Sequence, residues 1–372
     1  MSRRKIKIML VAGARPNFIK IAPLLKALKQ APHVETILVH TGQHYDFQMS
    51  DVFFKDLAIP KPDVYLNVGS GTHAVQTGRI LSAFENVLTK HRPDWVVVVG
   101  DVNSSMACAL AAVKLQIKIA HVEAGLRSFD RGMPEEINRV VTDRLSDFLF
   151  VSEDSGLRNL KREGVARGKV FHVGNVMIDS LVSSLGAIRG SDILKRLGLA
   201  GKAYGVVTLH RPNNVDDAAS LRETWRILRA VAQKTLIVFP VHPRTRARID
   251  AHGLRGDFRK LKNLKMTDPL GYTDFLRLVQ GARFVLTDSG GIQEETTFLQ
   301  VPCLTMRVNT ERPATIETGS NVLVGNDIGL ILSGVRRALS GRWKKTGVPR
   351  LWDGKAAIRI AKVLKSLDKP VF

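Results

Sequence analysis

Two kinds of hydrophobic pattern alternate along this chain. Short uninterrupted apolar runs, such as IKIMLVAG at 6–13 and WVVVVG at 95–100, are typical of parallel strands that are buried on both faces of a sheet. Stretches with apolar residues every three or four positions, such as 18–30 and 104–115, predict helices between the strands. This alternation predicts an α/β fold built from doubly wound parallel sheets.

The alternation is interrupted once, which predicts two domains. Residues 175–203 are helical in pattern and punctuated by Gly, and the strand pattern restarts at 205–210. A chain of 372 residues is also longer than one ordinary hydrophobic core. We therefore expect a Rossmann-like domain at 1–180, a second at 200–352, and a C-terminal helix at 353–372 that packs back toward the first. The other predicted strands are 36–40, 117–123, 147–152, 170–174, 235–242, 283–288, 302–306 and 321–325.

The composition indicates a globular cytoplasmic protein. Hydrophobic residues make up 44% and charged residues 24% of the chain, and no apolar run is long enough to cross a bilayer, so we expect no membrane partner. Lys7 interrupts the first apolar run, which we interpret as a buried strand and not as a signal peptide. Cys108 and Cys303 lie in apolar surroundings, which favours free buried thiols and a reducing compartment.

The net charge of +22 predicts an anionic ligand or partner. Nucleic acid is the obvious polyanion, but the Lys and Arg residues are spread along most of the chain. Aromatic residues are only 6% of the composition, which argues against a stacking platform for single strands. A phosphorylated small molecule is the better anion.

Ionisable residues follow several of the predicted strands. Asp101, Glu123 and His210 each stand at the end of an apolar run, and Arg15 and Lys20 follow the first one. The carboxyl ends of parallel strands meet at one edge of a sheet, where α/β proteins bind ligands. We expect these groups to share a cleft between the domains, where carboxylates and His act as acid and base while Arg and Lys hold phosphate. The alternative is that each of them caps a loop or is solvated.

The stretch TDSGGIQEE, at 287–295, predicts a phosphate-binding turn. Its small residues let backbone N–H groups approach an anion, and the helix predicted from near Ile292 adds a favourable dipole. The residues of this turn are Ser289, Gly290 and Gly291. Glu294 and Glu295 are expected in the first helical turn, where one of them accepts ribose hydroxyls or both only complement the helix dipole.

Two further helix starts are predicted beside the acidic residues. Pro134 fits the first position of a helix that places Glu135 and Glu136 in its first turn. Glu135 and Arg139 are spaced to pair across one turn. The helix after Asp101 is expected to be capped by Asn103 or Ser104.

Nine short motifs occur in one order between about residues 8 and 325. They are GARPNFIKIAP, TGQH, VVVGDVNSS, HVEAGLRS, PEEINR, TLHRPNN, HPRT, DSGGIQEE and TERP. With these motifs in this order, the chain resembles the non-hydrolysing UDP-N-acetylglucosamine 2-epimerases. The resemblance implies the glycosyltransferase-B architecture, in which two Rossmann-like domains face a central cleft, and it implies a homodimer.

The resemblance also implies a reaction and its residues. The family inverts C2 of UDP-N-acetylglucosamine by eliminating UDP to a 2-acetamidoglucal and adding it back, with no cofactor and no metal. The positions that match its catalytic residues are Asp101, Glu123, Glu135 and His210. The positions that match its substrate-binding residues are Arg15, Lys20, Arg139, Ser289, Gly290, Gly291 and Glu295.

Some members of the family bind a second substrate molecule as an activator. The matching positions here are Gln43, His44, Glu136, Arg211 and His242. Asp46 and the segment 69–73 depart from that pattern, so we expect weak or absent activation. Asn17, Phe18 and Pro212 also depart from the commoner form. These departures leave open UDP-N-acetylgalactosamine or a UDP-diacetamido-uronic acid as the substrate, and a UDP-sugar glycosyltransferase as the other class of enzyme.

Overall fold

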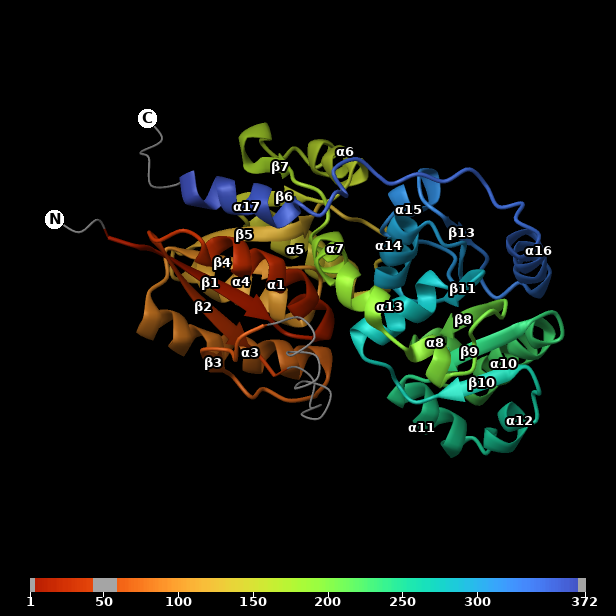
Figure 1. Cartoon of the computed structure of the whole chain (residues 1–372). Helices are drawn as coiled ribbons and strands as arrows, with labels where there is room; N and C mark the ends of the chain where they lie inside the picture. Colours follow the sequence, from red (N-terminus) through yellow and green to blue (C-terminus); the bar gives the residue numbers. More distant parts are fainter. Residues whose placement is uncertain (1–3, 43–58, 367–372) are drawn as a thin grey trace. The chain divides into compact units, whose positions relative to one another are not determined.

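The computed structural model describes residues 4–42 and 59–366, and the chain forms two compact units. Unit 1 contains Met1–Ser183 and Arg350–Phe372, and unit 2 contains Ser184–Pro349. Each unit has one parallel sheet and several helices, so the predicted α/β class is confirmed (Figure 1). Within the described ranges, no helix is both long enough and apolar enough to span a bilayer.

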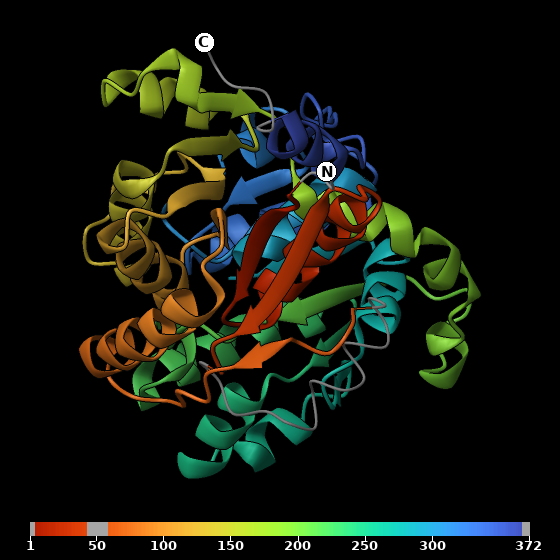
Figure 2. The same cartoon turned by 90° about the vertical axis from the view of Figure 1, so that its left-hand side faces the viewer.

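The sheet of unit 1 has the strand order β3-β2-β1-β4-β5-β6-β7, and all paired strands are parallel. Its strands are β1 (Ile6–Ala12), β2 (Val34–His40), β3 (Val64–Tyr65), β4 (Trp95–Val99), β5 (Lys118–Ala124), β6 (Phe148–Val151) and β7 (Val170–His172). The red strands β1 and β2 lie side by side in Figure 2. The winding reverses direction between β1 and β4, which is where such sheets bind ligands.

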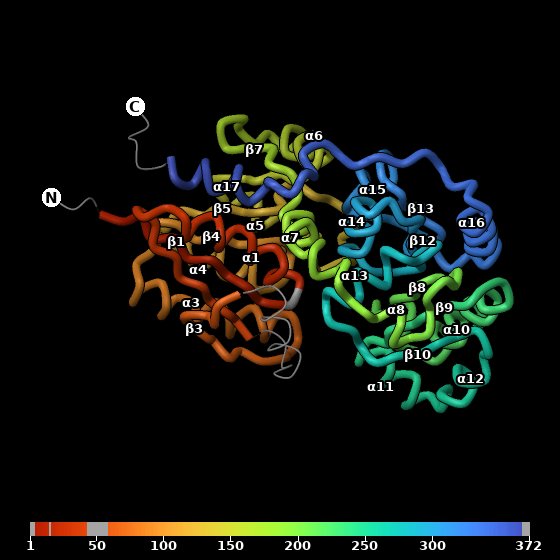
Figure 3. Tube along the Cα trace, in the orientation of Figure 1, coloured from red at the N-terminus to blue at the C-terminus, as the bar shows by residue number. Residues whose placement is uncertain are grey.

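Helices cover both faces of this sheet. Met9 and Val96 pack with Phe84 of α3 and Cys108 of α4, whereas the next residue along the strand, Val97, is equally buried on the other face. The C-terminal helix α17 packs against α1, so the chain's last helix lies beside its first (Figure 3). The helices are α1 (Arg15–Lys29), α3 (His73–His91), α4 (Asn103–Lys114), α5 (Pro134–Leu145), α6 (Asp154–Arg162), α7 (Val176–Gly190) and α17 (Ala356–Lys365).

The sheet of unit 2 has the strand order β10-β9-β8-β11-β12-β13, again with parallel pairs. Its strands are β8 (Tyr204–Thr208), β9 (Leu236–Pro240), β10 (Leu264–Thr267), β11 (Phe284–Thr287), β12 (Cys303–Thr305) and β13 (Asn321–Leu323). Its helices are α8 (Ile193–Arg196), α9 (Pro212–Val215), α10 (Ala218–Ala232), α11 (Pro243–Ala251), α12 (Arg255–Arg259), α13 (Tyr272–Gln280), α14 (Gly290–Leu299), α15 (Ala314–Glu317) and α16 (Ile328–Leu339). Here the winding reverses between β8 and β11.

All the predicted apolar runs form strands, but two strands within the described residues were not predicted. These are β3 and β10, which lie at the outer edge of their sheets and contain no fully buried residue. Edge strands lack the continuous apolar run of a central strand because only one neighbour covers them. Cys108 and Cys303 are buried free thiols, as predicted.

Candidate active site

Glu123 lies in a β-bulge near the carboxyl end of β5. The pairing with β6 shifts register between Val122 and Ala124, and Glu123 has a left-handed backbone with φ of 73°. A bulge turns a side chain away from the regular alternation of its strand. The Glu123 carboxylate forms an ion pair with the Lys20 ammonium of α1, and their side chains are only 2% and 6% exposed.

Gly100 shows how closely this ion pair lies to the end of β4. A β-carbon at Gly100 would lie 3.1 Å from Glu123 Oε2 and 3.3 Å from Lys20 Nζ. The backbone of Gly100 also has a positive φ of 67°, which favours glycine. Asp101 follows immediately, so three of the predicted residues, from α1, β4 and β5, gather at one edge of the sheet.

Arg139 links two of the acidic residues. Its guanidinium lies 2.7 Å from Asp101 Oδ2 and 2.7 Å from Glu136 Oε2. The predicted pair between Glu135 and Arg139 is therefore wrong, because Arg139 pairs instead with Glu136 on its own helix and with Asp101 beyond the end of β4. Pro134 does begin α5 and places both Glu residues in its first turn, as predicted. Glu136 also accepts hydrogen bonds from the Ser128 backbone N–H and hydroxyl, both at 2.8 Å.

A buried network supports the chain around Glu123. Asp143 on α5 lies 2.7 Å from His121 Nδ1 and 2.7 Å from Arg127 Nη2, and it accepts a 3.0 Å hydrogen bond from the Gly125 N–H. Burial raises the pKa of Asp143, but the His121 and Arg127 interactions outweigh it and lower that pKa below its ordinary value. His121 and Gly125 flank Glu123 closely in the chain, so this network fixes the backbone that carries it.

Asparagines stabilise the neighbouring loops. Asn17 accepts hydrogen bonds from the Gly13 and Ala14 N–H groups and donates one of 2.8 Å to the Val99 carbonyl. Asn17, which departs from the commoner family form, therefore connects the β1–α1 turn to β4 by hydrogen bonds. The prediction that Asn103 or Ser104 caps α4 is wrong. Val102 is the N-cap and makes no side-chain cap, because Asn103 is already helical and turns toward α3 and α5.

His210 and Asp288 form a pair at the reversal point of the second sheet. They follow β8 and β11, which are neighbours, and His210 Nδ1 lies 3.0 Å from Asp288 Oδ1. Asp288 also accepts hydrogen bonds from the backbone N–H groups of His210 and Arg211 and from Asn214 Nδ2. Burial raises the pKa of Asp288, but the interactions with His210 and the hydrogen bonds from Asn214 and Arg211 prevail and lower it.

The glycine-rich segment forms the start of α14. Ser289 is the N-cap and Gly290 the first helical residue, so the helix begins two residues before the predicted Ile292. Glu294 and Glu295 consequently lie beyond the first turn, and the prediction that placed them in it is wrong. Both are buried, and Glu294 pairs with Arg312 at 3.0 Å.

Arg307 is a residue of this site that the sequence did not single out. A β-carbon on Gly290 would lie 2.8 Å from Glu311 Oε1 and 4.0 Å from Arg307 Nη1, which places both side chains against the start of α14. Arg307 Nη2 pairs with Glu311 at 2.8 Å, while its buried Nη1 has no hydrogen-bond partner among the residues described. Burial lowers the pKa of Arg307 from its ordinary value. An unsatisfied guanidinium nitrogen beside a glycine-rich helix N-terminus suits an anionic ligand.

The remaining candidate residues lie as follows. Arg15 is the first residue of α1. His242 is the N-cap of α11, accepts a 3.2 Å hydrogen bond from the Arg244 N–H, and has its ring centroid 5.3 Å from that of His210. Gln43 and His44 lie outside the residues that the structure describes. Over 4–42 and 59–366, no group of three or more His, Cys, Asp or Glu residues could hold a metal ion.

Comparisons with known proteins give one consistent family. The family model described as UDP-N-acetylglucosamine 2-epimerase matches residues 26–365. A Methanococcus maripaludis protein described as a UDP-N-acetylglucosamine 2-epimerase homolog is 45% identical, over 97% of this chain and 100% of its own. A Pseudomonas aeruginosa UDP-2,3-diacetamido-2,3-dideoxy-D-glucuronate 2-epimerase is 42% identical, over 97% and 100%.

A solved structure agrees with these relatives. The crystal structure of Methanocaldococcus jannaschii UDP-GlcNAc 2-epimerase, in complex with UDP-GlcNAc and UDP, matches with a TM-score of 0.90 and 40% identity. The match covers 97% of this chain and 100% of that one. The motifs, the two parallel sheets and these similarities together show that the chain belongs to the UDP-N-acetylglucosamine 2-epimerase family.

Proposed function

We propose that this protein is an isomerase that interconverts UDP-N-acetylglucosamine and UDP-N-acetylmannosamine. The observation that carries the proposal is the start of α14, where glycine backbone and the unsatisfied Arg307 Nη1 suit a diphosphate. The other residues suit proton transfer at a sugar carbon. They are the acids Asp101, Glu123 and Glu135 in unit 1 and His210, oriented by Asp288, in unit 2.

The reaction divides into elimination and re-addition. A base takes the C2 proton, the electron pair forms the C1–C2 double bond, and the bond from C1 to the diphosphate oxygen breaks. Stabilising the leaving diphosphate is then the task of Ser289, Gly290, Gly291 and Arg307. UDP adds back to C1 while an acid delivers a proton to the opposite face of C2, so atoms and charge balance without an oxidant. We further propose that the enzyme works in the cytoplasm as a homodimer.

Proton NMR of UDP-N-acetylglucosamine with the protein in deuterated water tests this proposal. No cofactor or acceptor is added. We expect the manno epimer to appear with deuterium at C2, because the proton removed exchanges with solvent before another is delivered. If both substrate and C2 proton persist unchanged at high enzyme concentration, the proposal is wrong for this sugar.

A second substrate has support from the comparisons. Identity to the UDP-2,3-diacetamido-2,3-dideoxy-D-glucuronate 2-epimerase, at 42%, is close to the 45% for the N-acetylglucosamine relative. The same NMR measurement with the diacetamido-uronic acid nucleotide separates the two candidates. Deuterium incorporation into only one of them identifies the substrate.

Asp288 is expected to act by positioning His210. Its carboxylate holds Nδ1 and leaves Nε2 for the substrate, as a carboxylate does in other acid–base histidine pairs. Asp288→Asn should lower kcat about 100-fold, at the lower end of what one acid–base group contributes, with a much smaller change in KM. Steady-state kinetics at several pH values measure both constants.

Asp216→Asn is the matched control for that change. Asp216 is another aspartate of unit 2, and its carboxylate pairs with Arg244 and Arg248 instead of with His210. Asp216→Asn should leave kcat unchanged. A folded Asp288→Asn enzyme with wild-type kcat would show that the pair does not serve catalysis.

A further inference from the structure

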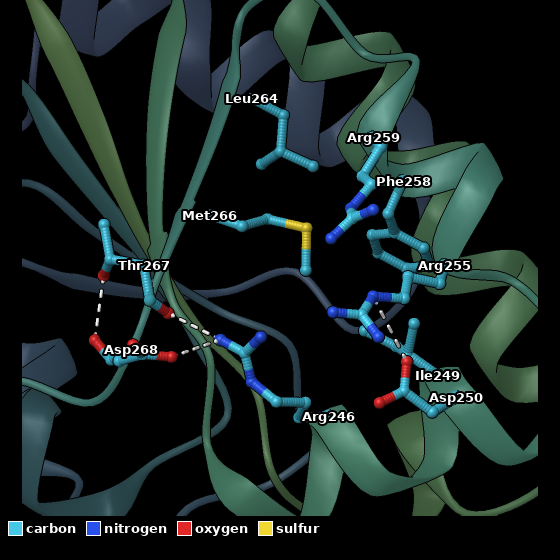
Figure 4. Close-up of a pocket in the computed structure, with 10 residues that line it drawn as sticks. All are labelled: Arg246, Ile249, Asp250, Arg255, Phe258, Arg259, Leu264, Met266, Thr267 and Asp268. Carbon is cyan, nitrogen blue, oxygen red and sulfur yellow. Dashed lines mark hydrogen bonds and ion pairs between the residues drawn. The ribbon is translucent and has the colours of Figure 1, made fainter.

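A cavity in unit 2 contains none of the residues assigned to the reaction above. It lies between α11, α12 and the edge strand β10, and its volume is about 370 Å³ (Figure 4). That volume falls within the range of small-molecule sites, toward its lower end. Its lining residues come from these three elements and from the residue that follows β10.

One part of the lining is apolar. Leu264 and Met266 alternate along β10, so both side chains point from the same face of the strand toward α12 (Figure 4). Ile249 of α11 and Phe258 of α12 complete this surface and are 2% and 1% exposed. Leu264 and Met266 remain partly exposed, so a ligand can still cover them.

The other part of the lining is cationic. The guanidinium groups of Arg246, Arg255 and Arg259 point into the cavity from two helices (Figure 4). Arg246 pairs with Asp268 at 3.0 Å, and Arg255 lies 3.8 Å from Asp250. Among the described residues, the guanidinium of Arg259 has neither a hydrogen-bond partner nor an ion-pair partner. Its five N–H donors are therefore available to a ligand.

The surrounding segment adds to the positive charge. Residues 244–265 contain eight Lys and Arg against two Asp, a net charge of +6. The epimerase site gives no reason for this concentration, which lies on unit 2 around the cavity. A low-dielectric wall beside clustered cations raises the local concentration of anions.

We propose that this cavity binds a small organic anion that carries one phosphate, sulfonate or carboxylate group on an apolar ring or short chain. The planar guanidinium of Arg259 suits two oxygens of such a group, and Arg255, one helical turn earlier, adds a second cation. The apolar body covers Leu264 and Met266. A pocket of this size accommodates one such group, whereas a single-stranded polyanion needs a groove with exposed aromatic platforms.

Calorimetric titration with phenyl phosphate and with inorganic phosphate tests the proposal. Saturating UDP is present in every titration, so that the nucleotide site of the full-length protein is filled. We expect phenyl phosphate to bind at one site per chain, at least about tenfold more tightly than inorganic phosphate, because its ring buries apolar surface.

Two matched variants locate that site. Arg259→Gln should weaken phenyl phosphate binding about tenfold, as expected for losing a charged hydrogen-bond donor. Lys262→Gln removes the same charge from an exposed residue of the same segment that does not line the cavity, and it should change binding by less than about twofold. Epimerisation should be unchanged in both variants.

Several results would overturn the proposal. They are the absence of phenyl phosphate binding, equal affinity for the two phosphates, and equal weakening by Arg259→Gln and Lys262→Gln. Binding to phosphatidylglycerol vesicles without binding to phenyl phosphate would instead identify the basic segment as a membrane-facing surface.

Discussion

Glu123→Gln should lower kcat for UDP-N-acetylglucosamine by about 10²- to 10⁴-fold, the contribution of one acid–base group. Gln keeps the shape of the side chain and an oxygen that accepts from Lys20 Nζ, so the buried contact with α1 survives. The variant loses the ability to exchange a proton with C2. Steady-state kinetics give the rate, and loss of deuterium incorporation at C2 shows which step has failed.

A surface glutamate provides the control for this change. Glu85→Gln removes the same charge from the exposed face of α3 in unit 1. It should leave both kcat and deuterium incorporation at the wild-type level. Wild-type turnover by both Glu123→Gln and Glu135→Gln would refute the assignment of these carboxylates to proton transfer.

Lys20→Met should destabilise the protein by about 3–5 kcal/mol, the usual cost of removing one partner from a buried ion pair. The Glu123 carboxylate, 2% exposed in its side chain, then stays in a low-dielectric position without this cation. The double variant Lys20→Met with Glu123→Gln should regain most of the loss, because it leaves a neutral amide beside an apolar side chain. Urea midpoints of the four proteins measure the coupling between the two residues.

An exposed pair in the same unit calibrates that measurement. Lys118 lies 3.2 Å from Asp147, and their side chains are 61% and 32% exposed. Lys118→Met should cost no more than about 1 kcal/mol, as exposed ion pairs contribute little. If the free-energy changes of Lys20→Met and Glu123→Gln simply add up in the double variant, the ion pair does not stabilise unit 1.

Three acidic residues near Glu123 also have a structural role in unit 1, because each forms an ion pair with an arginine. Glu136 and Asp101 share Arg139, and Asp143 binds Arg127 and His121 behind Glu123. In each case a buried or half-buried carboxylate faces a specific cation. These carboxylates of unit 1 are thus paired locally, and the net charge of +22 says little about the reaction site.

The order of strands and helices followed from the sequence alone. A continuous apolar run such as 95–99 predicts a central strand, because both of its faces must be buried. That assignment also predicted that Asp101 lies just beyond the end of the strand. The same reasoning placed Glu123 and His210 at strand ends. The motifs also indicated the family, because nine of them occur in one order over most of the chain.

The partners of these residues required the tertiary structure. Asp288 and Arg307 also follow apolar runs, so strand-end position gave a signal for both, but only the β8–β11 and β11–β12 pairing brings them to His210 and to the start of α14. The bulge that turns Glu123 toward Lys20 depends on register, which a run of apolar letters does not specify.

The same limit applies to the helix starts and to the cavity. Local cap preferences predicted that α4 is capped by Asn103 or Ser104 and that α14 begins near Ile292. In the structure, long-range hydrogen bonds of Asn103 place it inside α4, and the glycine backbone lets α14 begin at Gly290. The cavity joins two short helices to an edge strand whose weak pattern gave no prediction. Sequence thus determined which elements form and which family they build, while side-chain pairing across distant segments decided which atoms meet.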